Sequence, residues 1–259
     1  MLKKTGTFIH TEPKHSQPAR FLYLYPLDFT NMKIVALLPM KANSVRVKGK
    51  NFRDFCGKPL FRWILDTLLD VEEIDQIIIN TDARQILAAN GLVGTDRIII
   101  RDRKPEICGD HVSMNLVLGD DVACVPADLY LMTHTTNPLM SAETIRKAIE
   151  AFLKAQEAGH SDSLFTVDKV QTRFYRSDCS PVNHDPDNLI PTQNLEPWFE
   201  ENSNLYIFTA DSFSKTKARI GKKPMMYESP FFESIDIDTA TDWDFAVVAA
   251  RYLTEQSKA

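Results

Sequence analysis

Residues 33–51 read Lys33-Ile-Val-Ala-Leu-Leu38, then Pro39-Met-Lys41-Ala-Asn43-Ser44-Val-Arg46-Val-Lys48-Gly49-Lys50-Asn51. The apolar run at 33–38 has the length and the unbroken hydrophobicity of a strand that is buried on both faces. The polar and basic residues after it would then form a loop at the carboxyl end of a first parallel strand. Open α/β sheets bind their ligands at this position.

Strand and helix patterns alternate along the rest of the chain. Short apolar runs at 76–80, 97–101, 128–132 and 163–167 predict four more strands. Helical spacing predicts helices at 58–69, at 141–158, with Ser141 as N-cap and Gly159 as the stop, and at 240–256. Continuous apolar strands separated by helices predict a three-layer α/β/α, Rossmann-like nucleotide-binding fold with a mostly parallel sheet.

Two segments lack this alternation of strand and helix patterns. Residues 1–31 have no periodicity, and they are either an extension upstream of a natural start at Met32 or an arm that packs on a partner through 21–25. The main domain is therefore expected at 32–259. Residues 171–203 contain four prolines among Asp, Asn and Ser, and long irregular stretches in compact domains are usually functional. We expect them to be a substrate-side insertion or a dimerisation arm.

Composition excludes several classes of protein. The chain has 259 residues and a net charge of -5, whereas a nucleic-acid-binding domain would carry a basic footprint. No apolar run approaches the ~20 residues that span a bilayer, and no signal peptide is evident. The four cysteines form no C-x-x-C pair, so zinc is not expected. We expect a cytoplasmic protein that binds neither nucleic acid nor membrane.

The loop after the first strand has the chemistry of a phosphate site. Its backbone N–H groups can surround phosphates while its cations neutralise their charge. It is not a Walker A loop, because the required glycines are absent. On charge alone, a solvated basic loop is the alternative. The cations and the polar side chains among them are Lys41, Arg46, Lys48 and Lys50, with Asn43, Ser44 and Asn51.

A second candidate lies near the C-terminus, in Ser234-Ile-Asp236-Ile-Asp238-Thr239. If this segment ends a strand, Asp236 and Asp238 point to the same side. Paired carboxylates suit Mg²⁺ or Mn²⁺, which also bind substrate phosphates. The alternative is that Asp238 caps the last helix and Asp236 is merely exposed.

Together the two segments resemble the acylneuraminate cytidylyltransferase family, which includes CMP-sialic acid and CMP-Kdo synthetases. Further short segments match the family pattern in the same order along residues 32–255. The ordered set is more specific to the family than any single segment. These segments are Gly57-Lys-Pro-Leu60, Asn80-Thr-Asp82, Arg103-Lys-Pro-Glu106 with Asp110 and Ser113, His134-Thr-Thr-Asn-Pro-Leu139, and Glu201-Asn-Ser-Asn-Leu-Tyr206.

The resemblance implies roles for the matching residues. The chain would transfer CMP from CTP to the anomeric hydroxyl of a sialic-acid-like 2-keto sugar acid and release pyrophosphate. The catalytic residues would be Lys41, Lys50, Asp236 and Asp238, and the two aspartates would bind Mg²⁺ or Mn²⁺. His134 and Arg173 would face the sugar acid. CTP would be held by Lys41, Asn43, Ser44, Lys50, Asn51, Arg103 and Ser113, with Lys50 at the α-phosphate.

Departures from the family pattern cluster on the sugar side. Lys41 replaces an Arg and Val45 replaces a Lys in the loop, whereas His134 replaces Gln, and Glu200 stands where some members carry an Arg. Ser203-Asn204 replaces Gly-Ala. The nucleotide chemistry is therefore better supported than the identity of the sugar, which the sequence does not name.

Two other functions remain open at this point. A nucleotide-sugar glycosyltransferase also holds a metal with an Asp-x-Asp element, but that element normally follows a strand in the middle of the sheet. A degenerate, non-catalytic nucleotide-binding domain is the second. Release of pyrophosphate from CTP and a sugar acid separates all three. The family also predicts a homodimer, because its members exchange an arm comparable to 171–203 across a twofold axis.

Overall fold

The computed structural model describes residues 32–42 and 47–256. The expectations for residues 1–31, and for Asn43, Ser44, Val45 and Arg46 in the basic loop, lie outside the described residues. Within them, no helix has both the length and the apolar character that crossing a membrane requires.

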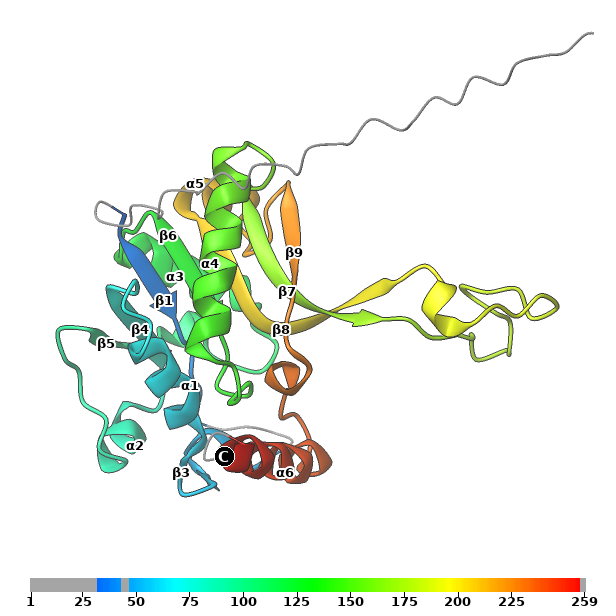
Figure 1. Cartoon of the computed structure of the whole chain (residues 1–259). Helices are drawn as coiled ribbons and strands as arrows, with labels where there is room; N and C mark the ends of the chain where they lie inside the picture. The colour runs from blue at the N-terminus through cyan, green and yellow to red at the C-terminus, as the bar shows by residue number, and fades with distance from the viewer. Residues whose placement is uncertain (1–31, 43–46, 257–259) are drawn as a thin grey trace, which may run out of the picture.

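A seven-stranded sheet in the order β5-β4-β1-β6-β8-β7-β9 forms the centre of the molecule (Figure 1). β5, β4, β1 and β6 run parallel, β8 is antiparallel to both of its neighbours, and β9 is parallel to β7. The predicted mostly parallel sheet is confirmed. The strands are β1 (Ile34–Leu37), β4 (Gln76–Thr81), β5 (Ile98–Asp102), β6 (Leu129–Thr133), β7 (Ser163–Val170), β8 (Trp198–Thr209) and β9 (Pro224–Glu228).

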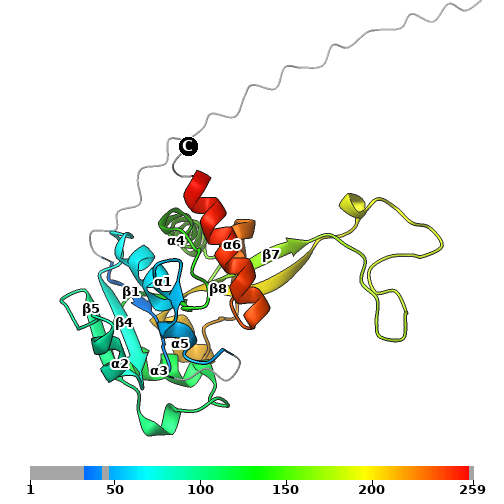
Figure 2. The same cartoon turned by 90° about the horizontal axis from the view of Figure 1, so that it is seen from below.

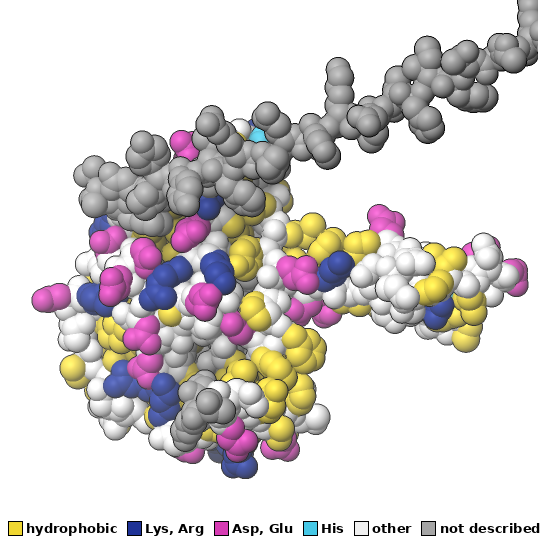
Figure 3. All heavy atoms as spheres, viewed as in Figure 1, with side chains coloured by type: hydrophobic (Ala, Val, Ile, Leu, Met, Phe, Trp, Pro, Cys, Tyr) yellow, Lys and Arg dark blue, Asp and Glu magenta, His cyan; other side chains and the backbone are white. Residues whose placement is uncertain are grey.

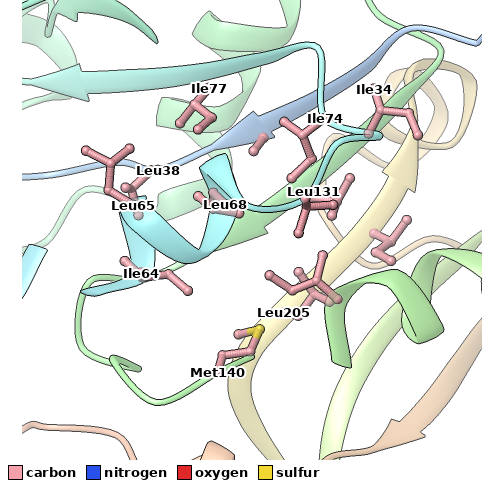
Figure 4. Close-up of a cluster of buried hydrophobic side chains, with 14 of the residues drawn as sticks. Ile34, Leu38, Ile64, Leu65, Leu68, Ile74, Ile77, Leu131, Met140 and Leu205 are labelled. Atoms are coloured by element: carbon pink, nitrogen blue, oxygen red, sulfur yellow. The ribbon is translucent and has the colours of Figure 1, made fainter. Parts of the chain in front are cut away.

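Helices cover both faces of the sheet. α1 and α4 pack on one face, where Ile64, Leu65 and Leu68 of α1 meet Ile77 and Leu131 of the sheet (Figure 4). Leu118 of α3 and Phe213 of α5 pack on the other face, so the predicted three layers are confirmed. The helices are α1 (Leu60–Leu69), α2 (Arg84–Ala89), α3 (Met114–Cys124), α4 (Ala142–Glu157), α5 (Ala210–Thr216) and α6 (Ala240–Gln256).

The ends of α4 follow its sequence signals. Ser141 Oγ accepts a hydrogen bond from Thr144 N at 3.1 Å, which satisfies an otherwise unpaired N–H of the first turn. Gly159 has φ +70°, a left-handed conformation that ends a helix and that glycine adopts without a steric penalty. Both predicted signals are confirmed.

α6 packs at one end of the body against the small β2–β3 hairpin (Asp54–Phe55 and Lys58–Pro59) (Figure 1). Figure 2 views the molecule from this end. Phe55 meets Trp243 of α6 edge to face at 5.4 Å between ring centroids. Ile237 is fully buried in the same cluster, and this anchor fixes the aspartates on either side of it.

β7 and β8 extend beyond the sheet into an arm that projects from the body (Figures 1 and 2). The predicted irregular insertion at 171–203 is too long, because Trp198 already begins β8 and the irregular part ends at Pro197. The first half of β8 is exposed and rich in Glu and Asn, so it lacks the apolar pattern of a buried strand. Apolar side chains show on the surface of the arm (Figure 3), and the exposed ones are Tyr175, Val182, Leu189, Ile190, Trp198 and Phe199.

Candidate active site

A cavity of about 460 Å³ lies at the carboxyl ends of β1 and β6, where open α/β sheets bind ligands. Its wall combines loops that are far apart in the sequence. The polar residues that line it are Lys41, Lys50, Asn51, Arg103, Asp110, His134, Thr135, Thr136 and Asp238.

Lys50 joins the basic loop to the acidic segment. It begins a short 3₁₀ helix, η1 (Lys50–Phe52), after Gly49, whose φ of +63° turns the chain back toward the sheet. The Lys50 ammonium group donates to the Ile237 carbonyl and lies 3.4 Å from Asp238 Oδ1. The residue is only 7% exposed, so a charged amine is held at the cavity with little freedom to move.

The acidic segment is not the end of a strand, so that expectation was wrong. It is an irregular connection between the 3₁₀ helix η4 (Phe231–Ser234) and α6. The Ile237 N–H donates to the Thr136 carbonyl at 2.9 Å, which ties the segment to the loop after β6. Asp238 lines the cavity.

Asp238 is not the cap of α6 either. Thr239 Oγ1 accepts from Asp242 N at 3.3 Å, and the Asp242 carboxylate accepts from Thr239 N at 2.7 Å. This reciprocal pair has the arrangement of a capping box, in which two otherwise unpaired N–H groups are satisfied. The capping role therefore belongs to Thr239 and Asp242, and the Asp238 carboxylate faces the cavity and Lys50 instead.

Asp236 is half-buried beside Thr136 and Asp238, and burial raises the pKa of its carboxyl above the ordinary value. Among the described residues, its Oδ1 is buried without a hydrogen-bond partner. A buried carboxylate oxygen with no donor is costly, and a cation beside Asp236 and Asp238 would relieve that cost. The donor set is oxygen only, which suits Mg²⁺ or Mn²⁺.

Arg103 is fixed in place, so it is not a mobile surface arginine. Its Nε donates to Asn80 Oδ1 at 3.0 Å and its Nη2 donates to the Asn80 carbonyl at 2.8 Å. Asn80 in turn donates from Nδ2 to Asp121 Oδ1 at 2.8 Å. A carboxylate only accepts and a guanidinium only donates, so the amide of Asn80 bridges two groups that need opposite partners.

Asp121, at the far end of this bridge, is fully buried in α3. Burial raises the pKa of its carboxyl to about 6, and the bonds from Asn80 and Arg101 counter that shift. Arg101 pairs with Asp121 and, at 2.8 Å, with Asp120. This charged network supports the Arg103 side of the cavity from behind.

Lys41 and Asn51 complete the same side. The Lys41 ammonium group pairs with Asp110 Oδ1 at 2.5 Å, and both side chains are about half exposed. Asn51 donates to the Lys41 carbonyl at 3.0 Å and accepts from Thr135 Oγ1 at 2.7 Å. Both ends of the Asn51 amide are therefore engaged in holding the loop against the end of β6.

His134 follows β6 directly, and its imidazole is uncharged at neutral pH. Burial lowers its pKa to about 4, and the positive charges of Arg219 and Lys50 contribute, whereas Asp238 opposes the shift. A neutral imidazole can donate one hydrogen bond and accept another, so this side of the cavity can bind hydroxyl groups.

A smaller recess of about 280 Å³ adjoins the cavity, and Met114 lines both. Ser113 lies in this recess, where it caps α3 by accepting from Asn115 N at 3.3 Å. Arg219 and Glu201 line the recess from opposite elements, the loop after α5 and β8. The nucleotide contact expected for Ser113 is therefore displaced from the main cavity.

The comparisons with known proteins agree on one family. The family described as "Cytidylyltransferase" matches residues 35–253. This chain is a member of the cytidylyltransferase family. It is 29% identical to CMP-N,N'-diacetyllegionaminic acid synthase of Legionella pneumophila, over 82% of this chain and 94% of that protein. It is 22% identical to pseudaminic acid cytidylyltransferase of Campylobacter jejuni, over 84% and 96%.

Solved cytidylyltransferase structures share the fold. A CMP:2-keto-3-deoxy-manno-octonic acid synthetase complexed with CTP has a TM-score of 0.59 and 16% identity, and the match covers 86% of this chain and 99% of that one. The 4-diphosphocytidyl-2C-methyl-D-erythritol synthase of Anaerococcus prevotii has a TM-score of 0.58 at 16% identity, over 85% and 99%. The resemblance seen in the sequence and the fold class are confirmed.

The cytidylyltransferase fold brings together most of the described residues singled out from sequence. Lys41, Lys50, Asn51, Arg103, His134 and Asp238 line one cavity, and Asp236 lies beside it. Arg173 does not join them within one chain. It lies in the arm, where its Nη2 donates to the Ile190 carbonyl at 2.6 Å.

Sequence reasoning missed Arg219, Asp121 and the bridging role of Asn80 in this cytidylyltransferase. The polar residues 217–223 precede a short edge strand and carry no motif. The one available signal was the adjacent pair Asp120 and Asp121. Asp121 is fully buried, and a fully buried carboxylate needs hydrogen-bond or charged partners.

Proposed function

We propose that this cytidylyltransferase transfers CMP from CTP to the anomeric hydroxyl of a sialic-acid-like 2-keto sugar acid and releases pyrophosphate. One observation carries the proposal: Lys50 and Asp238, from opposite ends of the chain, meet at 3.4 Å in the cavity at the strand ends. Two relatives matched over most of their length are named CMP-N,N'-diacetyllegionaminic acid synthase and pseudaminic acid cytidylyltransferase. The cytoplasm, where CTP is available, is the proposed location.

The chemistry needs charge neutralisation and alignment more than covalent help. The sugar hydroxyl oxygen forms a bond to the α-phosphorus while the bond from that phosphorus to the pyrophosphate oxygen breaks. Lys50 would contact the α-phosphate, since it is the most buried cation of the cavity. Arg103 and Lys41 would hold the remaining phosphates, and the Lys41–Asp110 pair would open to admit them.

Asp236 and Asp238 would hold Mg²⁺ or Mn²⁺ together with the nucleotide. The orphaned Oδ1 of Asp236 fits this role. Among residues 32–42 and 47–256, no group of three or more His, Cys, Asp or Glu side chains could hold a metal. Phosphate oxygens and waters would therefore complete the six-ligand shell. When bound, the ion would neutralise phosphate charge and increase the nucleophilicity of the hydroxyl.

Pyrophosphate release tests the proposal. CTP, UTP, ATP and GTP are each incubated with a panel of eight- and nine-carbon 2-keto sugar acids and Mg²⁺. We expect release that requires both CTP and one of the acids. Release with every nucleotide would remove the preference for cytidine, and no release with any pair would support a non-catalytic domain. Release of a nucleoside diphosphate from a nucleotide sugar would support the glycosyltransferase alternative.

A homodimer is part of the proposal. The arm exposes Leu189 (59%) and Tyr175 (55%) far from the core, and apolar side chains gathered on a projecting segment are typical of an interaction surface. In a dimer, Arg173 of one chain would be able to reach the cavity of the other chain. Light scattering at micromolar concentration should give twice the chain mass. A monomer mass would contradict the proposal, and Leu189→Asp with Ile190→Asp should convert a dimer to a monomer.

A further inference from the structure

The recess beside the main cavity has the features of a carboxylate-binding subsite. Its walls come from three separate parts of the chain and combine polar side chains with Met114, Ala218 and Ile220. Ser113 and Asn115 lie at the start of α3, Glu201 in β8, and Arg219 in the loop after α5. The recess meets the main cavity at Met114, which lines both. The two spaces are therefore immediate neighbours.

Arg219 is held firmly but retains unused donors. Its guanidinium lies over the ring of Tyr206, 3.9 Å from the centroid, and donates from Nη2 to the Tyr206 hydroxyl at 3.0 Å. The nearest Glu201 oxygen is 3.8 Å away, beyond hydrogen-bond distance. In the described part of the chain, the Arg219 side chain makes this one hydrogen bond, whereas a guanidinium has five N–H donors.

Arg219 lies near enough to the main cavity for its charge to act on His134, which lines that cavity. The positive charges of Arg219 and Lys50 both lower the pKa of the His134 imidazole. In a 2-keto sugar acid the carboxylate is attached to the carbon that carries the anomeric hydroxyl. The group that binds the carboxylate must therefore lie beside the α-phosphate position, where Lys50 stands.

The other cations of the cavity are committed elsewhere. Lys50 is held by the Ile237 carbonyl and Asp238, and Arg103 is held by Asn80. Lys41 pairs with Asp110 across the cavity mouth. Arg219 thus brings a positive charge to the recess that adjoins the cavity.

We propose that Arg219 binds the carboxylate of the acceptor sugar acid, and that Glu201, which lines the same recess, accepts a hydrogen bond from one of the sugar's hydroxyl groups. This inference rests on the proposed function. A planar guanidinium binds a carboxylate through two parallel hydrogen bonds, which fixes the orientation of the acceptor as well as its charge. The stacked Tyr206 ring holds the plane of the guanidinium before the acceptor arrives.

The experiment compares acceptors that differ only in the carboxylate. The full-length enzyme is assayed with CTP, Mg²⁺ and the sugar acid that the wild type uses best, and with the carboxamide of the same sugar. Arg219→Ala should lower kcat/KM for the acid by about 10- to 100-fold, mainly through KM for the acid, because a hydrogen bond to a charged group is lost. The carboxamide should be affected much less, and CTP affinity measured by calorimetry should stay unchanged.

Two further variants sharpen the test. Arg219→Lys keeps the charge but loses the paired donors, so its kcat/KM for the acid should fall between those of the wild type and Arg219→Ala. Lys222→Ala is the matched control, since it removes one exposed cation from the same loop. It should leave the preference for acid over amide unchanged.

Equal losses for acid and carboxamide in Arg219→Ala, or a parallel loss of CTP affinity, would overturn the inference and assign Arg219 a structural role. An unchanged acid preference in Arg219→Ala would overturn it as well. The wild-type assay separates this failure from failure of the proposed function. A wild type that releases no pyrophosphate with any sugar acid contradicts the function itself, whereas an active wild type with an indifferent Arg219 contradicts only the subsite.

Discussion

The proposed nucleotide half and the proposed acceptor half of the cavity are built in different ways. On the nucleotide side, Lys50 and Arg103 are fixed by buried backbone and side-chain partners. On the acceptor side, His134 and Arg219 come from a strand end and a loop after a short helix, next to a recess with both polar and apolar walls. Lys50 and Arg103 are therefore held in place before any ligand binds. The acceptor half is assembled from connections, and connections tolerate substitution more readily than the elements they join.

The difference predicts which substitutions affect every acceptor equally and which affect only some. Changes on the nucleotide side should reduce transfer to all sugar acids by the same factor. Changes on the acceptor side should alter the ranking of the acids and leave CTP binding alone.

Lys50→Met should nearly abolish turnover while the chain still folds. Methionine fills the buried space of the lysine stem but removes the charge at the α-phosphate, so kcat should fall roughly 10²- to 10³-fold. The same loss is expected with each acceptor in the panel. Lys48→Met, an exposed neighbour in the same loop, is the control and should stay near wild type. Selective loss with one acid would place Lys50 on the acceptor side instead.

Asp238→Asn and Asp236→Asn should each reduce activity about 10²-fold, because each removes a carboxylate from the proposed metal site. The stability of Asp236→Asn without ligands should not fall. The folded state raises the pKa of Asp236, so its ionisation costs stability as pH rises from the ordinary value of 3.8 through the raised one. Asp236→Asn removes that cost, and its melting temperature at pH 7 should equal or exceed that of the wild type.

Thr239→Ala supplies the opposite control. It removes the side-chain cap of α6 and should lower the free energy of unfolding by about 1 kcal/mol, with kcat nearly intact. Activity of the wild type in EDTA, or full activity of both Asn variants, would contradict the metal site.

Asn80→Ala should weaken CTP binding about 10-fold and leave KM for the acceptor unchanged. The amide of Asn80 holds Arg103 against the buried Asp121, and its loss removes one hydrogen bond from each of them. The free energy of unfolding should also fall by about 1–3 kcal/mol. Calorimetry with CTP and thermal unfolding measure the two effects. Asn188→Ala, in the exposed arm, is the control, and unchanged CTP affinity in Asn80→Ala would show that Arg103 needs no such support.

His134→Gln should have the smallest effect. The His134 pKa of about 4 means that the imidazole is neutral above pH 5, so glutamine can replace its hydrogen bonds without a change of charge. The pH profile of kcat/KM between 6 and 8 should keep its shape, and the ranking of acceptors should shift by less than about 10-fold.

The pH dependence of the stability of His134→Gln tests whether His134 is neutral in the folded state. The folded state holds His134 neutral while the unfolded state gains a proton near pH 6.5, so the wild type loses stability as pH falls from 6.5 toward 4. His134→Gln should reduce that loss, and the exposed His160→Gln should not. An NMR titration of His134 with a midpoint near 6.5 would contradict the assignment.

The sequence located part of the proposed nucleotide half because two of its cations follow strands that the sequence predicts. Apolar runs at 33–38 and 97–101 predicted the strand ends, and Lys41 and Arg103 follow them in the chain. The pairing of Lys50 with Asp238 was not predictable from spacing, since the two are 188 residues apart and meet through tertiary packing of Ile237. The strand expected at 234–239 was wrong for a similar reason. Ile235 and Ile237 have the spacing of a strand, but they are buried in the cluster with α6 and not in the sheet.

The acceptor half was poorly predicted for a physical reason. The exposed start of β8 and the loop that carries Arg219 have no hydrophobic period, so periodicity gave neither their structure nor their neighbours. Arg173 was expected to face the sugar, yet it lies in the arm. Arg173 could reach a cavity only if that cavity belonged to a second chain. The sequence of one chain gives no direct signal of such an assembly.

Tracing the phosphates of CTP tests whether the enzyme transfers CMP to the sugar acid. CTP labelled at the α-phosphate, or separately at the γ-phosphate, is incubated with the enzyme, Mg²⁺ and a 2-keto sugar acid, and the products are separated. We predict that the α label appears in a compound with the mass of CMP joined to the sugar acid, and that the γ label appears in pyrophosphate. Alpha label recovered only in CTP, CDP or free CMP, with or without an acid, would contradict the account.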